Sequence, residues 1–595
     1  MKRASHAGSA SQRAVQRSTY SGAISALALA LLPCASAHAL EFNSTDFAGS
    51  LDTTVSYGAV YRMQDQDGKL ISRSNGGSGD NGPITFDDGN LNFRKGEQVS
   101  EVAKVVSDLQ VTFRRNYGMF LRGRAFYDFV IEDERRRHRE ISDDGKDYAG
   151  SRAEILDAFV YGSHEFGNRM FSARLGKQVI NWGESIFVQN GISATNPFDV
   201  SALRAPGSEL REAFLPTLMA SFSVQVTDTV TLEGYWQPAS SWEKVRLDPC
   251  GTYFSTTDVL GDDGCDYLPI ASVQEAFSAQ LGNRTAFDSP AAVTAYVNQL
   301  PAALQPIAQQ LLGSTFVRRS NDIEPNSAQY GASLRWFVPE LNQTEFGAYY
   351  IRYSTQTPVV SAIAGSLATT PIGVVPDPSS ARYFSEYIGG LDLYGLSFNT
   401  TLNGGFFDGL ALSGEFSYRP DSVISKYTPS NVIAPAVTGA LPGGTYIQGF
   451  EQRDRAQLSL AAVYLLPSGV LSADSGSLIV EASANRIYGS LAPAMFDDPD
   501  LPGGMTNSSW GATLSGSLSY LDVMGIFTLS PGMSVYSAIN GRNGANNEGE
   551  RAYSLKMDAM YKERIGMGVG YTTYHGGGRK NRDRDFLSFN VKYSF

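Results

Sequence analysis

The last ten residues of the chain alternate strictly between apolar and polar side chains. They read Phe-Leu-Ser-Phe-Asn-Val-Lys-Tyr-Ser-Phe, from Phe586 to Phe595. One face of a strand would carry Leu587, Phe589, Val591, Tyr593 and Phe595. Such a strand, ending in an aromatic residue, suits the closing strand of an outer-membrane β-barrel, because one face lies in lipid and the other in a wet interior. A soluble sheet protein can end in the same way, so a second feature is needed to distinguish the two.

The other end of the chain has the organisation of a secretory signal peptide. Four basic residues precede the first acidic residue, Glu41, and an apolar run follows at 26–32. Pro33 then breaks the run before the small-residue site Ala37-His38-Ala39. An N-terminal membrane anchor is disfavoured, because spanning a bilayer takes about 20 apolar residues. The pattern predicts that residues 1–39 are a signal peptide cleaved near Ala39, and that the protein is exported.

Composition and charge narrow the class of exported protein. The 595 residues include 60 Gly, 30 Tyr and 32 Phe, but only 18% charged residues, against about 25% in average soluble domains. Aromatic girdles and glycine-rich turns are typical of membrane barrels. The formal net charge of −12 becomes −16 when the four basic residues of 1–39 are removed. A chain this acidic is not expected to bind nucleic acid.

Segments of alternating polarity recur along the mature chain. They include 51–63, 410–418, 456–464, 510–520 and 553–561, each with one apolar face and one face that carries Ser, Thr or charged residues. Counting such segments predicts about eighteen strands, within a range of sixteen to twenty. The fold predicted for residues 40–595 is therefore all-β: a transmembrane, antiparallel, up-and-down β-barrel.

Short and long connections alternate between these strands. The expected short turns are 116–118, 227–229, 339–343, 530–532 and 562–564. The expected long connections lie near 64–104, 132–152, 182–216, 239–326, 355–385, 421–450 and 489–507. This alternation is typical of outer-membrane barrels with short periplasmic turns and long extracellular loops. An even strand number also leaves both ends of the barrel on the periplasmic side.

The segment 239–326 is long enough to need structure of its own. It contains Cys250 and Cys265, which we expect to form a disulfide in an oxidising compartment. A metal site is disfavoured, because no His or further Cys lies close in sequence. Helical spacing predicts helices over 273–281 and 290–312. The resulting extracellular subdomain would either cap the outer mouth, fold inward as a plug, or remain a solvated surface domain.

The predicted third strand carries an unusual set of charges. Arg122, Arg124 and Asp128 share one parity, which would place them in the lumen. Arg114 just before this strand and Arg174 on the fifth strand would join them. Such a patch would guide an anionic head group. We favour the alternative, a structural network in which Asp52, Asp128 and Asp157 neutralise Arg114, Arg122 and Arg124.

The sequence offers no recognisable catalytic or metal-binding motif. Its only His residues after maturation are His138, His164 and His575, and none belongs to a hydrolase or metalloprotease motif. We therefore expect no enzymatic activity and no cofactor. An acidic first loop fits no Ca²⁺-binding spacing, so no metal site is predicted; its residues are Asp65, Asp67, Asp80, Asp87 and Asp88. The charge run 132–140 would contact lipopolysaccharide phosphates or simply be solvated.

One block of sequence resembles a known family. Residues 174–185 read Arg-Leu-Gly-Lys-Gln-Val-Ile-Asn-Trp-Gly-Glu-Ser, followed by Asn-Pro-Phe-Asp-Val at 196–200 and by 203–216. With Phe42–Tyr61, Leu91–Lys95 and the closing strand, they resemble a proteobacterial outer-membrane family labelled as a domain of unknown function. Genes of that family often lie beside an outer-membrane lipoprotein and a resistance-nodulation-type exporter. The resemblance implies passage of a hydrophobic or amphipathic molecule, with a periplasmic or outer-membrane lipoprotein as a possible partner.

Within this block, residues 186–216 have little regular periodicity. A barrel of about eighteen strands encloses a wide lumen unless something fills it. We predict that 186–216 folds inward and narrows the pore, with an outward surface loop as the alternative. The candidate constriction residues are Trp182, Glu184, Asn196, Asp199, Arg204 and Arg211.

Taken together, these features predict a channel or transporter in the outer membrane of a Gram-negative bacterium. Its expected substrates are small hydrophobic or amphipathic compounds of lipid, sterol or aromatic type, and its surroundings are outer-membrane lipid and lipopolysaccharide. Two alternatives remain open: a substrate-selective porin for small organic anions, and a structural or adhesive surface barrel. The residues alone do not give the substrate, the direction of transport or the oligomeric state.

Overall fold

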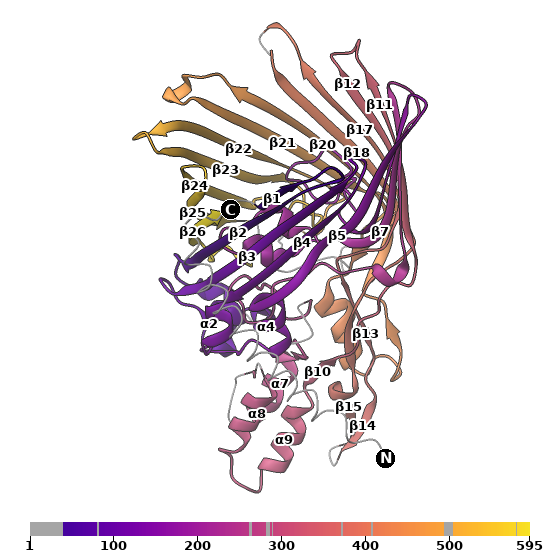
Figure 1. Ribbon diagram of the computed structural model, residues 1–595. Helices are drawn as coiled ribbons and strands as arrows, with labels where there is room; N and C mark the ends of the chain where they lie inside the picture. Colours follow the sequence, from indigo (N-terminus) through magenta and orange to yellow (C-terminus); the bar gives the residue numbers. More distant parts are fainter. Residues whose placement is uncertain are drawn as a thin grey trace.

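The computed structural model describes residues 40–79, 82–260, 265–280, 286–287, 289–370, 373–405, 408–492, 504–576, 578 and 580–595. The signal peptide predicted for 1–39 and the loop residue Asp80 lie outside the described residues. Figure 1 shows one large barrel whose strands run obliquely, with helices and short strands gathered at one end.

The barrel is a single antiparallel sheet. Its strands are β2 (Phe47–Arg62), β3 (Gln98–Phe113), β4 (Tyr117–Asp128), β5 (Ser151–Phe166), β6 (Arg169–Gln178), β7 (Thr217–Gln225), β8 (Val230–Gln237), β11 (Gln329–Val338), β12 (Thr344–Tyr353), β17 (Leu391–Leu402), β18 (Leu410–Ser425), β20 (Phe450–Leu466), β21 (Ser475–Ile487), β22 (Ser508–Val523), β23 (Phe527–Asn540), β24 (Arg551–Tyr561), β25 (Ile565–His575) and β26 (Phe586–Ser594). A short strand, β1 (Leu40–Asn43), pairs with the start of β2.

Pairing between the first and last strands closes the cylinder. β2 pairs with β26 over nine residues, from Thr54 opposite Ser594 to Arg62 opposite Phe586. On its other side β2 pairs with β3, and the remaining neighbours follow in chain order. Apart from β1, this sheet forms a closed ring of 18 strands, so the predicted fold class and strand number are confirmed.

The two ends of the barrel differ in the length of their connections. Turns of a few residues, such as 114–116, 524–526 and 562–564, join strands at one end, and long loops join them at the other (Figure 1). The predicted turn at 530–532 is wrong, because these residues lie inside β23. The first long loop is shorter than predicted, since β3 begins at Gln98. Two further connections at the loop end, 541–550 and 576–585, were not predicted.

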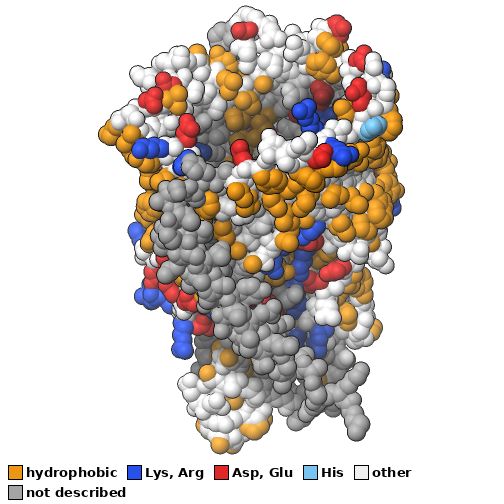
Figure 2. Space-filling view, viewed as in Figure 1, with side chains coloured by type: hydrophobic (Ala, Val, Ile, Leu, Met, Phe, Trp, Pro, Cys, Tyr) orange, Lys and Arg blue, Asp and Glu red, His pale blue; other side chains and the backbone are white. Residues whose placement is uncertain are grey.

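The outward face of the wall is apolar. Large apolar side chains recur at the outward-facing positions of the strands and are exposed to the surroundings, for example Leu175 at 59%, Leu396 at 60% and Leu555 at 61%. Figure 2 shows hydrophobic side chains gathered on the part of the barrel wall that is in view. The same parity holds in the last strand, where Phe589 and Val591 are exposed. None of the helices among the described residues is long and apolar enough to cross a membrane.

Three long loops share a second sheet at the loop end. Its five strands lie in the order β19 (Tyr446–Ile447), β13 (Val359–Ile363), β16 (Arg382–Glu386), β10 (Phe316–Arg319) and β9 (Tyr267–Pro269). A small hairpin, β14 (Leu367–Thr370) with β15 (Gly373–Pro376), extends one of these loops. Val317, Val360 and Tyr383 are buried in the core beneath this sheet, together with Val432 and Ile447. The loops therefore form a cap with its own hydrophobic core.

Short helices complete the loop end and the barrel interior. They are α2 (Asp88–Asn92), α3 (Phe129–Asp133), α4 (Asp143–Ala149), α5 (Val200–Arg204), α6 (Leu210–Ala213), α7 (Ala271–Gln280), α8 (Pro290–Val297), α9 (Gln305–Gly313) and α10 (Ala434–Val437). The single helix predicted over 290–312 is in fact α8 and α9, which pack through Val293, Ala308 and Leu312. Ser289 caps α8 by accepting a hydrogen bond from the Ala292 amide, ahead of Pro290.

The connection from β8 to β11 (238–328) has two differently placed parts. Its first part enters the loop cap: Tyr253 is buried against Val60 and Phe93 at the barrel mouth, and its hydroxyl donates to the Asp585 carbonyl. The helices α7 to α9 project away from the barrel (Figure 1). The predicted disulfide joins Cys250 and Cys265, whose Cα atoms are 6.1 Å apart.

This disulfide should stabilise the loop rather than the barrel. Its closed loop spans a sequence separation of 15 residues, for which chain entropy gives about 3 kcal/mol. We expect Cys250→Ser with Cys265→Ser to accelerate proteolysis within 246–269 and to leave the thermal unfolding of the barrel unchanged. Limited proteolysis followed by mass spectrometry measures the first, and heat-dependent gel mobility the second. Equal cleavage with and without the disulfide would contradict this expectation.

Candidate functional site in the barrel lumen

Residues 179–216, which we call the inward segment, leave the wall at the end of β6 and return to it at β7. Asn196 fixes the base of the segment: it accepts from the Ile180 amide and donates to the carbonyls of Gln178 and Leu215. The segment then forms α5, capped by Asp199, and α6, in which Glu209 and Glu212 make a capping box. Local capping therefore gives it a definite shape inside the barrel.

Two glutamates on the opposite wall hold the tip of the inward segment. Glu415 on β18 accepts hydrogen bonds from the amides of Glu184 (2.8 Å), Ser185 (3.2 Å) and Ile192 (3.1 Å). A Cβ at Gly191 would lie 1.6 Å from the Glu415 carboxylate, so glycine is required there. These three hydrogen bonds and the close approach of Gly191 hold the tip against β18.

Glu481 on β21 holds the tip in the same way as Glu415 does. We call each of these carboxylates, with the backbone amides that donate to it, a glutamate cradle. It is fully buried and accepts from the amides of Ile186 (3.0 Å), Phe187 (2.6 Å) and Val188 (3.1 Å). The carboxylates thus take up backbone donors that would otherwise be left unpaired in an irregular stretch.

The base of the inward segment is held to the near wall by ion pairs. Lys104 on β3 pairs with Glu212 (2.8 Å), and Lys592 on β26 pairs with Glu209 (3.1 Å). Arg124 on β4 pairs with Asp199 (3.0 Å). Together with the two glutamate cradles, these pairs show that the segment runs through the lumen from the β3–β4–β26 side to the β18–β21 side.

The arginines of β4 belong to a neutralised network. Arg122 pairs with Asp108 (2.8 Å) and Asp157 (3.2 Å). Arg124 is buried between Glu154 and Asp199, which also bind Arg246. The favoured interpretation from sequence, a structural network, matches these contacts, although Asp108, Glu154 and Asp199 supply charges that the sequence had assigned to Asp52 and Asp128.

Of the other three lumen candidates, Arg114 and Asp128 lie elsewhere than expected. Arg114 is in the β3–β4 turn, is largely exposed and pairs with Asp46. Asp128 is buried at the end of β4, where it caps α3 by accepting from the amides of Val130 and Ile131. Arg174 does face the lumen, with its guanidinium 5.4 Å from the centre of the Phe159 ring.

The remaining constriction candidates all have partners. Trp182 is buried against Tyr235 and Tyr349 and donates to Glu233 (2.9 Å). Glu184 accepts from the Asn399 amide, and Arg211 pairs with Asp108 and Glu209. Arg204 pairs with Asp248. These side chains hold the inward segment in place, so the space left for a solute lies elsewhere.

A wet sector of the lumen lies along β22–β26. Its inner face carries small polar residues in paired rows, such as Ser515, Ser534, Ser554 and Thr572. The Lys556 and Asp558 side chains on this face are 60% and 52% exposed. Among the described residues, the inward segment makes no hydrogen bond or ion pair with β23, β24 or β25, although its Glu209 pairs with Lys592 at the β26 edge of the sector. The segment therefore fills the middle of this sector less than it fills the β3–β8 and β18–β21 walls.

A cavity of about 240 Å³ lies where the tip of the inward segment meets this sector. Phe187 and Gln189 line it from the segment, and Asn485, Thr513 and Asn546 line it from the wall and the 541–550 loop. The alternation through 410–418 and 456–464, continued by one residue to Arg419 and Arg455, puts Glu415, Arg419 and Arg455 on the polar faces of their strands but indicates no role for them. The only signal was their parity, since their partners lie far away in the chain.

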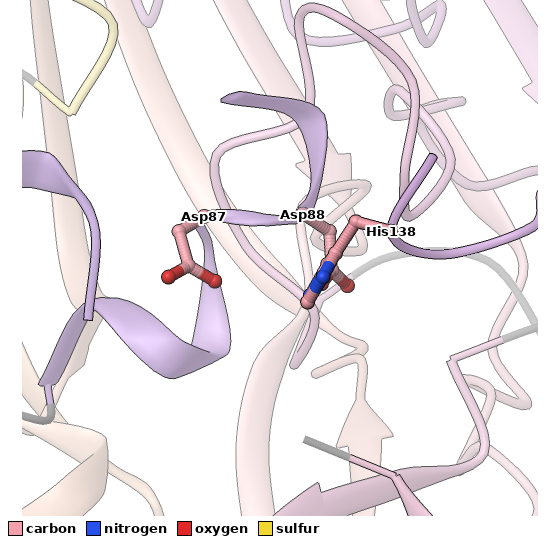
Figure 3. A group of neighbouring side chains, drawn as sticks. All are labelled: Asp87, Asp88 and His138. Atoms are coloured by element: carbon pink, nitrogen blue, oxygen red, sulfur yellow. The ribbon is translucent and has the colours of Figure 1, made fainter. Parts of the chain in front are cut away.

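A separate cluster of ionisable groups lies in the loop cap. Figure 3 shows the Asp87 and Asp88 side chains beside His138. Arg139 pairs with Asp88 (2.6 Å) and with Asp258 (3.2 Å), so the cluster already contains a cation. Burial raises the pKa of Asp87 to about 6, against hydrogen bonds from Ser72 and Asn75. Burial and the nearby Asp88 also raise the pKa of Asp258 well above its usual range.

The raised pKa of Asp87 predicts a loop that loosens as pH rises. Since the folded value of about 6 exceeds the unfolded value of 3.8, the stabilisation is present below pH 4 and is lost through pH 6. At 1.36 kcal/mol per pKa unit, this amounts to about 3 kcal/mol. We expect hydrogen exchange of the Ser72 amide, which donates to Asp87, to speed up over this range beyond the intrinsic rate. Asp87→Asn should flatten that dependence, and an unchanged profile would contradict the assignment.

Comparison with solved structures finds distant likenesses to outer-membrane proteins of two bacteria. OccAB3 and OccAB1 of Acinetobacter baumannii are both 9% identical, with TM-scores of 0.39 and 0.41; the matches cover 92% of this chain and 99% and 96% of those chains. OccK2 of Pseudomonas aeruginosa, solved in complex with glucuronate, is 8% identical with a TM-score of 0.37, covering 92% and 98%. Likenesses this distant carry no argument about function. The chain matches no curated protein sequence.

A family match extends over nearly the whole chain. The family described as "Protein of unknown function (DUF1302)" matches residues 21–595. The match includes the block 174–216 and the closing strand, on which the resemblance to a family of unknown function was based. The chain therefore belongs to the DUF1302 family.

Proposed function

We propose that this protein is an outer-membrane channel for small solutes, with the pathway along the β22–β26 side of the lumen. The observation that carries the proposal is the contrast between the two halves of the interior. The inward segment and its ion pairs fill the side of the lumen formed by β26, β3–β8 and β18. The small polar side chains of β23–β25 make no hydrogen bond or ion pair with the segment among the described residues, and the Lys556 and Asp558 side chains there are 60% and 52% exposed. A purely structural barrel has no need of such a polar open sector.

Two properties of the barrel wall support the proposed location in the outer membrane. A closed barrel leaves no unpaired strand edge, and its apolar outward face suits acyl chains. The long loops would then face the medium and the short turns the periplasm, as in barrels of this architecture.

The polar lining favours small polar or amphipathic solutes, including organic acids, over purely hydrophobic ones. A second candidate, the handling of a hydrophobic compound, is favoured by an apolar hollow of about 1160 Å³ on the outward side of β3–β12. Gly162, Ala173, Gly234 and Ala332 form its floor, beside Trp236. The lipoprotein partner implied by the family resemblance stays a prediction.

Conductance measurements test the proposed function. The purified, detergent-folded protein, reconstituted in planar bilayers with 1 M KCl, should give steady ohmic single-channel steps. Replacing Ser534 and Ser554 of the wet sector by Trp should lower the step size, while the same replacement at outward-facing Met533 and Leu555 should not. Absence of current from protein that shows the heat-dependent gel mobility of a folded barrel would reject the channel, and uptake of a hydrophobic tracer into liposomes would then support the second candidate.

A further inference from the structure

We propose that Arg419 and Arg455 form a binding site for a small carboxylate inside the lumen. This inference rests on the proposed channel function and names the substrate class that the channel would select. The two residues lie directly opposite each other on β18 and β20. They share the inward parity of Glu415 and Gln457, whose side chains contact the inward segment.

The pair differs from every other buried arginine group of the lumen in lacking a carboxylate. Arg122, Arg124 and Arg246 each have acidic partners within 3.3 Å. Among the described residues, no acidic group lies within ion-pair distance of Arg419 or Arg455. Two positive charges thus meet across neighbouring strands, with Arg419 only 8% exposed.

Neutral groups orient the two guanidiniums without compensating their charge. Arg455 donates twice to the Asn485 side-chain oxygen (2.9 and 3.2 Å). Arg419 donates to the Gly191 carbonyl at the tip of the inward segment (2.6 Å), and its guanidinium lies 5.3 Å from the centre of the Tyr353 ring. Like charges opposite each other in a sheet are destabilising, and buried charges normally have a counter-charge. The arrangement is therefore built for an anion that arrives from solution.

Unused hydrogen-bond donors around the pair indicate where that anion would sit. The Arg419 Nε atom and the Nδ2 atoms of Asn485 and Asn546 are buried without a hydrogen-bond partner. Asn485 and Asn546 also line the cavity of about 240 Å³ beside the tip of the inward segment. Asn485 thus joins the arginine pair to a space that could hold about eight water molecules at 30 Å³ each. Planar guanidinium forks match a planar carboxylate in two parallel hydrogen bonds.

The ligand assigned to this site is a carboxylate of few heavy atoms. Arg419 and Arg455 would bind it, and it would reach them through the cavity at Asn485 and Asn546. It would bind transiently, since the adjoining wet sector offers an exit. No chemical step is involved, because the site supplies only charge and donors.

Channel block tests this proposal in the full-length mature protein. Sodium benzoate should reduce the chloride current of the wild-type channel, and Arg455→Gln should raise the half-blocking concentration at least tenfold. Arg419→Gln should act in the same direction. Arg486→Gln is the matched control, since Arg486 lies on the neighbouring strand β21 with outward parity. Unchanged block in both lumen variants, with normal single-channel conductance, would overturn the carboxylate site while leaving the channel intact.

Two further measurements separate the remaining outcomes. If the wild-type protein carries no current, the channel proposal fails, and benzoate binding to the detergent-folded protein by isothermal titration calorimetry tests the site independently. Binding lost in Arg455→Gln and kept in Arg486→Gln supports the site; binding equal in all three overturns it. Inorganic phosphate is tested alongside benzoate, and equally strong block by phosphate would overturn the carboxylate assignment. Without ligand, Arg455→Gln should not lower the unfolding temperature, because the removed charge has no acidic counter-charge among the described residues and a glutamine amide can still donate to Asn485.

Discussion

Replacing both Glu415 and Glu481 with glutamine should raise the single-channel conductance several-fold. Together the two carboxylates accept six backbone hydrogen bonds from the tip of the inward segment. Hydrogen bonds to a charged group contribute about 1.5–3 kcal/mol each, and a glutamine side chain replaces one acceptor oxygen by a donor. The tip should therefore leave the β18–β21 wall and open the lumen.

Glu451→Gln is the control for this experiment. Glu451 lies on β20, between the two strands that carry the glutamates, but it pairs with Arg453 rather than with the inward segment. We expect its conductance to equal that of the wild type. A double variant that folds and conducts like the wild type would show that the tip does not limit the pathway.

Arg124→Ala should be among the most destabilising single substitutions in the barrel. The change removes the cation that lies between Glu154 and Asp199 and the donor to the Glu212 carbonyl. Breaking a buried pair by removing one partner costs about 3–5 kcal/mol, because the remaining charge is left buried. Urea unfolding in the presence of lipid vesicles, followed by tryptophan fluorescence, measures the loss.

The matched control is an ion pair at the barrel end. Arg169 pairs with Asp228 (2.7 Å), with side chains that are 41% and 91% exposed. Exposed pairs contribute about 0–1 kcal/mol, so Arg169→Ala should unfold almost as the wild type does. Equal losses for the two arginines would contradict the role assigned to the β4 network.

Strand periodicity made the barrel predictable from sequence. A strand with lipid on one face and water on the other requires alternating apolar and polar side chains, and this requirement is visible in the local sequence. The alternation in Phe586–Phe595 is found again in the exposure of the β26 side chains. The predicted turn at 530–532 failed because the propensity of Pro and Gly for turns was overridden by the sheet. The register of β23 with β22 is the same on both sides of Pro531, with Gly532 opposite Ser517 and Leu529 opposite Tyr520, and on its other side Pro531 lies opposite Met557 of β24. The strand therefore continues through the Pro-Gly pair, although Pro531 has no N–H group to donate.

The site was less predictable, because its contacts join distant parts of the chain. The Glu184 amide and the Glu415 carboxylate that accepts its hydrogen bond are 231 residues apart in sequence. Local pattern shows that Glu415 lies on a polar face but not what it binds. For the same reason the sequence drew attention to Arg122 and Arg124 without indicating that Asp108 and Asp199 pair with them. It gave no role to Arg419 and Arg455, which have no acidic partner among the described residues.

The five-stranded sheet of the loop cap makes the exposed face of this protein a composite. β9 and β10 come from one loop, β13 and β16 from a second, and β19 from a third. An antibody or phage that recognises this face would contact residues brought together from 267–447, so linear peptides from any one loop should compete poorly. Excising 239–326 would also strip β9 and β10 from β16, leaving a bare strand edge for self-association. Surface recognition is therefore best dissected by point substitutions on the intact cap.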